Sequence, residues 1–204
     1  MPVAPEPSEQ RGEGRDRCLE GRRVRLRPTT VADGEWIYDL ELRLGLAGLP
    51  TLDRFLSAYD KRAAALFVIC DRRDGTRVGT SGLFHLDDGN VEWGISTDPD
   101  SGLPGAGVEA AFLIIDYAFA TRDIHKLYGR TTSASTASFG GTIARLSRRE
   151  GVLHQHEFFR GQFWDLYLSA IYRDDWMRAG RPIVERLTGG REQASEQDRR
   201  ITGP

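Results

Sequence analysis

The sequence predicts a protein of the α/β (α+β) class, with a mixed, mostly antiparallel central sheet of about seven strands and about four flanking helices. Three observations predict this class. A strand-like segment comes first and is followed by two helical segments. Three strands separated by short turns come next, and after them single helices alternate with strands up to a closing hairpin. This irregular order differs from the strict alternation of a doubly wound parallel sheet.

The first strand and the two helices after it are predicted in the segment 23–63. Basic and aliphatic residues alternate over 23–27, which is the period of a half-buried strand. Thr29 to Asp33 supply an N-cap and an acidic first turn for a helix that ends near Gly45. A second helix is predicted over 52–63. The apolar residues at helical spacing in these two helices are Trp36, Ile37, Leu40 and Leu44, then Phe55, Leu56 and Tyr59.

The rest of the sheet is predicted in the segment 65–171. Turn-forming Asp-Gly pairs separate three strands of an antiparallel meander, and Arg160-Gly161 joins the two strands of a final hairpin. The predicted elements are strands at 65–71, 77–85 and 90–97, a helix at 107–120, a strand at 126–131, a helix at 136–149, and strands at 152–159 and 163–171.

Composition excludes several classes of protein. The net charge of -2 and pI near 6.1 give no field that attracts nucleic acid or an anionic membrane. The longest apolar stretches are far shorter than the roughly 20 residues that span a bilayer, and 1–10 lack the pattern of a signal peptide. We therefore expect a cytoplasmic protein with neither a nucleic-acid nor a membrane partner. Cys18 and Cys70 suggest neither a disulfide framework nor a zinc site.

Two polar tails are predicted at the ends of the chain. Residues 1–17 hold three prolines and seven charged residues with almost nothing apolar, so burial cannot offset the entropy cost of ordering them. The glycine-rich end has the same character. The predicted organisation is a disordered tail at 1–20, a single domain at 21–187 and a second disordered tail at 188–204.

Both the order of elements and one local segment of this sequence resemble those of a known family. Trp93-Gly-Ile-Ser-Thr-Asp-Pro99 precedes a glycine-rich turn and the helix Glu109-Ala-Ala-Phe-Leu-Ile-Ile-Asp-Tyr-Ala-Phe119. This segment resembles the donor-binding strand, loop and helix of the GNAT acyltransferases (GCN5-related N-acetyltransferases), over about 22–178. The resemblance implies the GNAT fold and acetyl-CoA or acyl-CoA as co-substrate.

The loop between this strand and helix departs from the family pattern. GNAT proteins place Gln/Arg-x-x-Gly-x-Gly/Ala here, because backbone N–H groups and the helix dipole hold the diphosphate of coenzyme A. The matching segment is Asp100 to Gly105, in which an acid replaces Gln/Arg, Leu103 replaces the first glycine and Pro104 removes an N–H donor. A purely structural glycine-rich turn is an equal alternative. The donor-binding residues that the resemblance implies are Ile95, Ser96, Thr97, Gly102, Gly105, Ala106, Gly107, Ser135 and Ser138.

A second segment of the sequence matches the same family without a gap in the alignment. Ser135-Thr-Ala-Ser138, Glu150-Gly151, Glu157 and Gly161-x-x-x-Asp165 resemble the spacing in the RimJ/RimL-like branch, which acetylates the N-termini of ribosomal proteins. Ser135 replaces the usual Asn. This branch is the closest resemblance.

The resemblance also implies catalytic roles. Ser138 would lie beside the thioester sulfur and could protonate the departing thiolate; helix capping alone is the alternative. Glu157 would be the general base that takes a proton from the acceptor ammonium group, whereas an isolated Glu on a strand is more often simply exposed. Glu92, which points to the side of its strand opposite Trp93, is the second candidate base.

Other site types receive less support. His154 and His156 at i, i+2 would share one face of a strand, but no Cys or carboxylate pattern completes a metal site, so no metal is expected. Aromatic residues near the candidate site are more often core or groove wall: Trp36, Phe158, Phe163, Trp164 and Trp176. Neither a Gly-x-Ser-x-Gly elbow nor a phosphate-binding Gly-Lys-Ser/Thr loop is present, which disfavours hydrolases and NTPases.

Three functions remain open. The first is transfer of an acyl group from acyl-CoA to a primary amine, on a small molecule or a protein N-terminus, with preference for the small molecule. The second keeps this chemistry but takes the acyl group from an acyl carrier protein, whose phosphopantetheine arm has no diphosphate. The third is a non-catalytic binding domain. A homodimer is compatible with each.

Overall fold

The fold is one seven-stranded sheet with helices on both faces. The computed structural model describes residues 19–45, 49–58, 63–135 and 140–188. The strand order is β1-β2-β3-β4-β5-β7-β6. Every neighbouring pair is antiparallel except β4 and β5, which are parallel. The strands are β1 Val24–Pro28, β2 Ala63–Asp71, β3 Arg77–Asp87, β4 Asn90–Thr97, β5 Lys126–Thr132, β6 Arg148–Phe159 and β7 Gln162–Tyr172.

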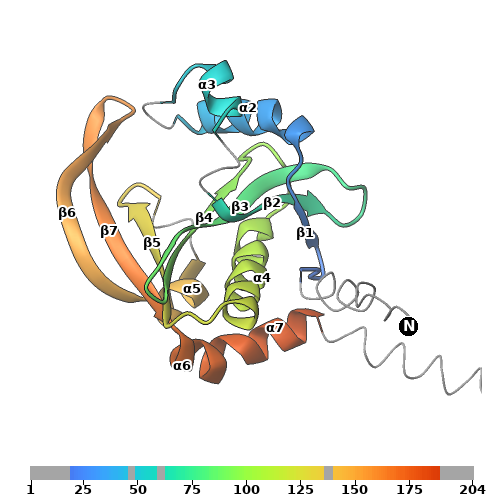
Figure 1. Cartoon of the computed structure of the whole chain (residues 1–204), viewed down its shortest axis with the longest axis vertical. Helices are drawn as coiled ribbons and strands as arrows, with labels where there is room; N and C mark the ends of the chain where they lie inside the picture. Colours follow the sequence, from blue (N-terminus) through green and yellow to red (C-terminus); the bar gives the residue numbers. More distant parts are fainter. Residues whose placement is uncertain (1–18, 46–48, 59–62, 136–139, 189–204) are drawn as a thin grey trace, which may run out of the picture.

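Helices precede, interrupt and follow the sheet, and Figure 1 shows α4 along its centre. A short 3-10 turn, Val31–Asp33, leads into the first of them. The C-terminal helices α6 and α7 are joined by a π-helical turn, Trp176–Gly180. The helices are α2 Gly34–Leu44, α3 Leu52–Leu56, α4 Ala106–Thr121, α5 Gly140–Leu146, α6 Arg173–Asp175 and α7 Arg181–Thr188.

The main core lies between the sheet and α4. Apolar residues cover α4 almost all round, so this helix is buried by β1 to β4 on one side and by α5 and α7 on the others. Trp176 is fully buried against α4 and donates its indole N–H to Asp116 Oδ1 at 3.1 Å. Arg173 caps the end of α4 by donating to the carbonyl oxygens of Phe119, Arg122 and Ile124.

The opposite face of the sheet packs against α2. Ile37 and Leu40 of α2 are buried, as is Val68 of β2, and none of the three belongs to the α4 core. Two ion pairs hold the helix at its ends. Asp33 accepts hydrogen bonds from Arg27 at 2.7 and 2.8 Å, and Arg43 binds Asp98 at 2.8 Å. The predicted start of this helix is confirmed, since Asp33 also accepts from the Thr30 backbone N–H. Its predicted end is confirmed by Gly45 in the left-handed conformation.

Two predicted helices were too long. The segment predicted as helix over 52–63 is helical only to Leu56, and Ala63 already belongs to β2. The Ser57 hydroxyl donates to the Arg54 carbonyl, and this local bond competes with continuation of the helix. The helix predicted over 136–149 ends at Leu146, because Arg148 and Arg149 pair with β7. Its first four residues, 136–139, lie outside the described part of the chain.

The C-terminal helical segment, residues 173–188, was not predicted as helix. Charged residues dominate it, and the amphipathic pattern is interrupted by the π-helical turn, where Gly180 lies against the ring of Trp176. At the other end of the domain, Leu19 is buried in the α4 core and Glu20 bridges to Arg25, although the sequence assigned both to the tail.

Candidate active site at the divergence of β4 and β5

The central strands β4 and β5 pair over three residues and then separate. The parallel ladder joins Asn90, Val91 and Glu92 to 126–128, after which β4 keeps only β3 as a neighbour and β5 keeps only β7. Trp93 marks the point of divergence. A Cβ built on Gly129 would lie 3.1 Å from its indole Nε1, so the ring lies directly against the β5 backbone. A glycine is therefore needed where the opening begins.

Beyond Trp93, one edge of β4 has no strand partner among the described residues. The Asp98 N–H donates to Val78 O of β3 at 2.9 Å. Backbone groups alternate in direction along a strand, and the β3–β4 register is unbroken over 92–97. The backbone groups of Ile95 and Thr97 therefore point toward the opening. Both are predicted donor-binding residues, and their N–H and C=O groups are those that an extended ligand could bind.

Residues 98–105, which include the predicted donor segment Asp100 to Gly105, join this edge to α4. Gly102 and Gly105 have positive φ angles of 62° and 81°, which favour glycine. A Cβ on Gly107 would lie 3.0 Å from Thr97 Cγ2, so the first turn of α4 approaches the end of β4 closely. The first N–H groups of α4 have no acceptors within the helix. Loop, strand edge and helix start are therefore contiguous, and Ala106 is buried. Some loop N–H groups, those of Asp100 and Ser101 among them, already donate to Asp98.

Arginines from outside the loop lie beside it. Arg43 of α2 binds Asp98 Oδ2, while Asp98 Oδ1 accepts the Asp100 N–H at 3.0 Å. Arg23 donates to Pro104 O at 2.9 Å, and its Nη1 would lie 3.5 Å from a Cβ on Gly105. The loop lacks the basic residue of the family pattern, but α2 and the residue that precedes β1 bring two guanidinium groups to it.

Glu109, in the first turn of α4, does not face this surface. Its side chain is buried, and Oε1 accepts the N–H groups of Arg23 and Val24 at 2.8 and 3.3 Å. The carboxylate therefore fastens the chain at the start of β1 to the first turn of α4.

Ser135 lies at the end of β5, beyond the opening. Its N–H donates to Thr132 O at 3.0 Å, and the two hydroxyl groups are 3.2 Å apart. Ser138, the predicted proton donor, lies outside the described residues.

Glu92 lies where the strands part, on the face opposite α4. Its Oε1 accepts from Arg130 Nε at 2.8 Å, and its Oε2 is 2.7 Å from His85 Nδ1. The expected orientation opposite Trp93 is confirmed. Tyr128 pairs with Glu92 across the ladder, and burial together with the Glu92 charge raises the pKa of its hydroxyl. This tyrosine, which the sequence analysis did not select, is a protonated group beside the opening.

Glu157 lies on the same face of the sheet but further along it. Tyr128 pairs with Ala170 of β7, whereas Glu157 pairs with Trp164, an even number of residues away, so both side chains share a face. The six positions that separate Ala170 from Trp164 correspond to roughly 20 Å along the strand. The side chain of Glu157 is half-buried and has no hydrogen bond or ion pair among the described residues.

The strand that carries His154 and His156 is not regular, as the sequence analysis had assumed. Three residues of β6, 154–156, oppose Asp165 alone, and Gln155 in this bulge has a φ of 50°. Asp165 holds the bulge by accepting the Gln155 N–H at 2.8 Å, which is the main reason why the pKa of Asp165 is lowered. The two histidines are therefore not i, i+2 neighbours on a regular strand. Within the described residues, no group of three or more His, Cys, Asp or Glu could hold a metal ion.

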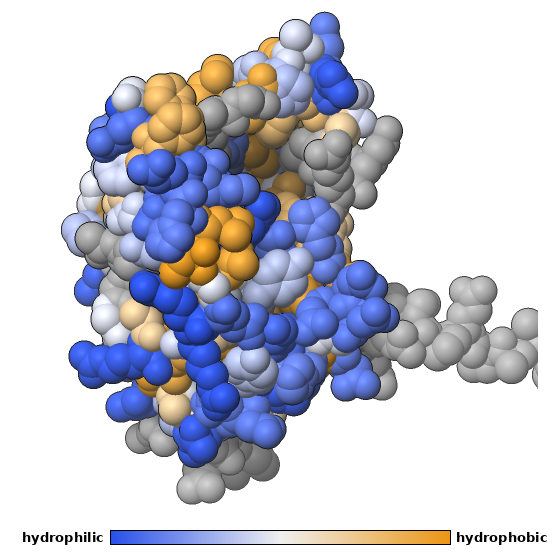
Figure 2. All heavy atoms as spheres, turned by 90° about the vertical axis from the view of Figure 1, so that its left-hand side faces the viewer, coloured by the Kyte–Doolittle hydropathy of each residue, from blue (hydrophilic) through white to orange (hydrophobic). Residues whose placement is uncertain are grey.

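The tip of the β6–β7 hairpin carries two of the predicted groove aromatics. Phe158 and Phe163 pack edge to face with ring centroids 5.0 Å apart, but they are 53% and 62% exposed and neither belongs to the core. Figure 2 shows this side of the molecule as mostly hydrophilic, with separate apolar patches. Trp164 and Phe159 stack on the other face of the hairpin, beside Glu157.

A further carboxyl group faces the candidate site from α2. Glu41 shares the inward side of this helix with Ile37 and Leu40, and its hydrogen-bonding partner is Ser96 of β4. Burial raises the pKa of Glu41, while Ser96 opposes the shift. The sequence analysis missed it, although an acid at a position where the helix period requires an apolar residue was a readable signal.

Comparison with known proteins identifies a family for most of this region. Residues 23–140 match the family model described as the acetyltransferase (GNAT) domain. No curated protein matches the sequence significantly. The family match does not select the ribosomal-protein branch.

Solved structures share the fold at low sequence identity. Mutant forms of the spermidine/spermine N-acetyltransferase SpeG from Vibrio cholerae have a TM-score of 0.68 at 18% identity, covering 76% of this chain and 97% of theirs. The Vibrio cholerae spermidine N-acetyltransferase in complex with CoA and spermine has a TM-score of 0.65 at 17% identity, with 76% and 98% covered. A GNAT-family acetyltransferase from Bacillus anthracis has a TM-score of 0.62 at 20% identity, with the same coverage.

Proposed function

The chain belongs to the GNAT acetyltransferase family, and from this premise we propose that it transfers an acyl group from acyl-CoA to a primary amine on a small molecule. One observation carries the proposal. The divergence of β4 and β5 leaves a free strand edge that leads directly to the start of α4. An extended thioester arm can pair with that edge while its diphosphate lies at the helix N-terminus.

The two arginines beside the loop favour coenzyme A as donor. Asp100 is exposed and opposes a diphosphate, but Arg23 and Arg43 reach the same loop from other elements. Arginine binds phosphate oxygens through paired N–H groups, so these side chains can replace the missing basic residue of the loop. An acyl carrier protein remains the alternative donor, because Asp100 and Pro104 would not disturb an arm without a diphosphate.

The carboxylates on the face opposite α4 favour a cationic acceptor. Glu41, Glu92 and Glu157 all lie on this side of the sheet. An amine is mostly ammonium at pH 7, and carboxylates attract it before one of them removes its proton. The solved relative that was crystallised with CoA and spermine is consistent with this chemistry.

In the proposed reaction Glu157 accepts the proton. The free amine nitrogen then attacks the thioester carbonyl carbon, a C–N bond forms and the C–S bond breaks. The departing thiolate takes a proton from Ser138. We favour Glu157 over Glu92 because both oxygens of Glu92 already accept hydrogen bonds, whereas Glu157 has no such partner among the described residues.

Calorimetry with three probes tests the choice of donor. Acetyl-CoA, coenzyme A and an acylated carrier protein are titrated separately into the full chain. We expect both coenzyme A forms to bind. Binding of the carrier protein alone would contradict the choice of donor, and binding of none of the three would contradict an enzymatic role.

An acceptor screen tests the second half of the proposal. Release of free thiol is followed with acetyl-CoA and a panel of diamines, polyamines, monoamines and peptides with free N-termini. We expect turnover with small amines that carry a second positive charge. Turnover confined to peptides would replace the small-molecule acceptor with a protein N-terminus.

A further inference from the structure

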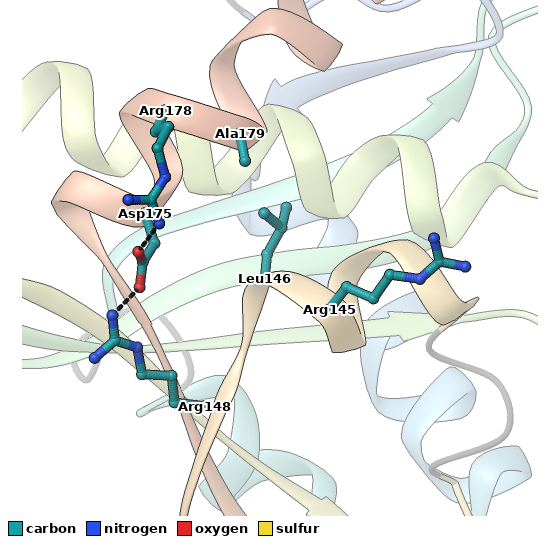
Figure 3. A pocket seen from close by; sticks show the side chains of 6 residues that line it. All are labelled: Arg145, Leu146, Arg148, Asp175, Arg178 and Ala179. Carbon is teal, nitrogen blue, oxygen red and sulfur yellow. Dashed lines mark hydrogen bonds and ion pairs between the residues drawn. The ribbon is translucent and has the colours of Figure 1, made fainter.

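The cavity between α5, β6 and the C-terminal helices connects these elements. It has a volume of about 260 Å³, and both Arg148 of β6 and Arg178 of the π-helical turn line it. Asp175 accepts from the two arginines at 2.5 and 2.6 Å, and Figure 3 shows both contacts converging on this carboxylate. These charged groups are paired with one another, so they fasten the start of β6 to the C-terminal helices.

Two glycines face each other in the sheet beside the opening between β4 and β5. Gly82 of β3 and Gly94 of β4 are paired in register. Their neighbours Leu83 and Trp93 lie in the α4 core, so the glycines lie on the opposite face, together with Glu92. We call this side of the sheet, which also carries Glu157, the acceptor face. It has no side chain of its own at these two adjacent positions.

The ring of Phe84 occupies the space above both glycines. A Cβ built on Gly82 would lie 2.6 Å from Phe84 Cζ, and a Cβ built on Gly94 would lie 3.4 Å from Phe84 Cε2. Phe84 is paired with Glu92 across the β3–β4 ladder, so its ring leans from this pair toward the glycines. Gly82 must lack a side chain for the ring to take this position.

The ring of Phe84 remains partly exposed. It does not belong to the α4 core, and α2 covers the acceptor face further along, where Val68 is fully buried. Polar groups border the ring along β4, with Glu92 on one side and Ser96, the partner of Glu41, on the other. An apolar surface with a few polar groups at its border is typical of a small-molecule site.

We propose that Phe84 determines which acceptors the protein takes, because the carbon segment next to the reacting amine packs on its ring. This inference rests on the proposed function. A thioester arm paired with the free edge of β4 would lie about 4.8 Å from that strand, and the ring lies above Gly94 of the same strand. An amine that attacks the thioester from the acceptor face therefore has its carbon segment beside Phe84.

The chemistry of the ring defines a class of acceptor. An aromatic ring offers a large apolar contact area but no acceptor for the hydroxyl groups of a polar substrate. A hydroxyl group buried against it without a hydrogen bond would lower affinity. The preferred acceptors are therefore amines carried by methylene groups or other apolar carbon, and hydroxyl-rich amines such as amino sugars are disfavoured.

Two diamines of equal length and charge test this preference. Cadaverine and its ether analogue differ only in the central group, which is a methylene in the first and an oxygen in the second. Each is titrated into the full chain, and its affinity is measured by calorimetry. We expect cadaverine to bind about fourfold more tightly, since burial of one methylene group contributes about that factor.

Three variants assign the preference to the ring. Phe84→Ala removes the ring, so the two affinities should become equal, whereas Phe84→Leu keeps an apolar side chain and should retain part of the preference. Gly82→Ala keeps the ring but places a Cβ where its Cζ lies, so the ring must move and both diamines should bind more weakly. Phe163→Ala is the matched control, since Phe163 is an exposed phenylalanine on the face of the hairpin opposite Glu157.

Several results would overturn the proposal. They are equal affinity for the two diamines in the wild type, binding of neither, and a preference that Phe84→Ala leaves unchanged. If circular dichroism shows that Phe84→Ala is unfolded, affinities that stay unchanged in Gly82→Ala overturn it instead.

Release of free thiol from acetyl-CoA separates this inference from the proposed function. Transfer to amines without a preference that depends on Phe84 would overturn the inference and leave the proposed function standing. A binding preference that depends on Phe84, without transfer to any amine, would support the inference that Phe84 selects amines and contradict the proposed reaction.

Discussion

At the scale of single residues, three carboxyl groups on one face of the sheet have different surroundings and are therefore suited to different roles in the proposed reaction. Glu92 is occupied by Arg130 and His85, Glu41 is buried against Ser96, and Glu157 is half-buried without a partner among the described residues. These surroundings suit different roles. Glu92 is held by two partners, Glu41 is a carboxyl group whose pKa is raised by burial, and Glu157 is available to act as a general base.

Glu157→Gln tests the base. The amide keeps the size of the side chain but cannot accept a proton, so kcat should fall by about 10² to 10⁴. Calorimetric affinity for acetyl-CoA should not change. Glu92→Gln is the matched variant, and if it abolishes turnover while Glu157→Gln does not, Glu92 is the base.

Glu41→Gln tests the buried acid through stability. Burial raises the pKa of Glu41, so its ionisation disfavours the folded state above the ordinary pKa of Glu. The variant should therefore melt at a higher temperature than wild type at pH 7. The difference should shrink as the pH falls through the raised pKa of Glu41 toward about 4.5, and below that value, where both states hold the proton, it should vanish. A constant difference from pH 4 to pH 8 would show that burial of the charge is not the cause.

The residue scale is also where the sequence predicts least. The motif spacing selected Glu157 as the candidate base, which stays a prediction, and strand alternation placed Glu92 correctly opposite Trp93. It did not reveal the bulge at 154–156, because the bulge depends on a bond from Gln155 to Asp165 across the hairpin. Nor did it reveal that Arg23 and Arg43 meet at the donor loop, since the contacts join β1 and α2 to residues more than fifty positions away.

At the scale of elements, α2 links the two halves of the candidate site. Asp33 ties its start to β1 and Arg43 ties its end to the donor loop, and Glu41 lies between them. Sequence patterns predicted this helix and all of β4, because capping residues and hydrophobic period are local signals. They overextended two helices, whose ends depend on local serine bonds and on pairing with β7.

Asp33→Asn tests the anchor of α2. The Arg27 guanidinium lowers the pKa of the buried Asp33 carboxyl, so this pair contributes stability above the ordinary Asp pKa and loses it as the pH falls through the lowered value. Replacing the carboxylate leaves Arg27 unpaired and should cost about 2 to 3 kcal/mol in the free energy of unfolding at pH 7. Urea denaturation at pH 7 and pH 3 measures this cost, which should be smaller at pH 3. Equal stability of variant and wild type at pH 7 would show that the Arg27–Asp33 pair does not anchor α2.

Arg43→Gln tests the donor loop. If Arg43 serves the diphosphate, acetyl-CoA affinity should fall about tenfold while the melting temperature changes little, because the Arg43–Asp98 pair is partly exposed. Arg54→Gln on α3 is the control, since its side chain is exposed and it makes no ion pair among the described residues. Equal donor affinity in both variants would contradict a role of Arg43 in donor binding and would favour a purely structural role for the loop.

At the scale of the whole molecule, the sheet is built around one parallel pair in an antiparallel frame. The fold and the acyltransferase family agree with the sequence prediction, while the C-terminal helices that support α4 were missed because their charged composition hides the buried Trp176. Within the described segments, no helix is long and apolar enough to cross a membrane.

Amide hydrogen exchange with and without coenzyme A tests the central claim most directly, because it reports where the donor lies. The account predicts slower exchange at the N–H groups of Ile95, Thr97 and Gly107, which face the opening or begin α4, and no change at Val68 inside the β2 ladder. Protection elsewhere on the molecule, with these three amides unchanged, would contradict a donor site at the divergence of β4 and β5.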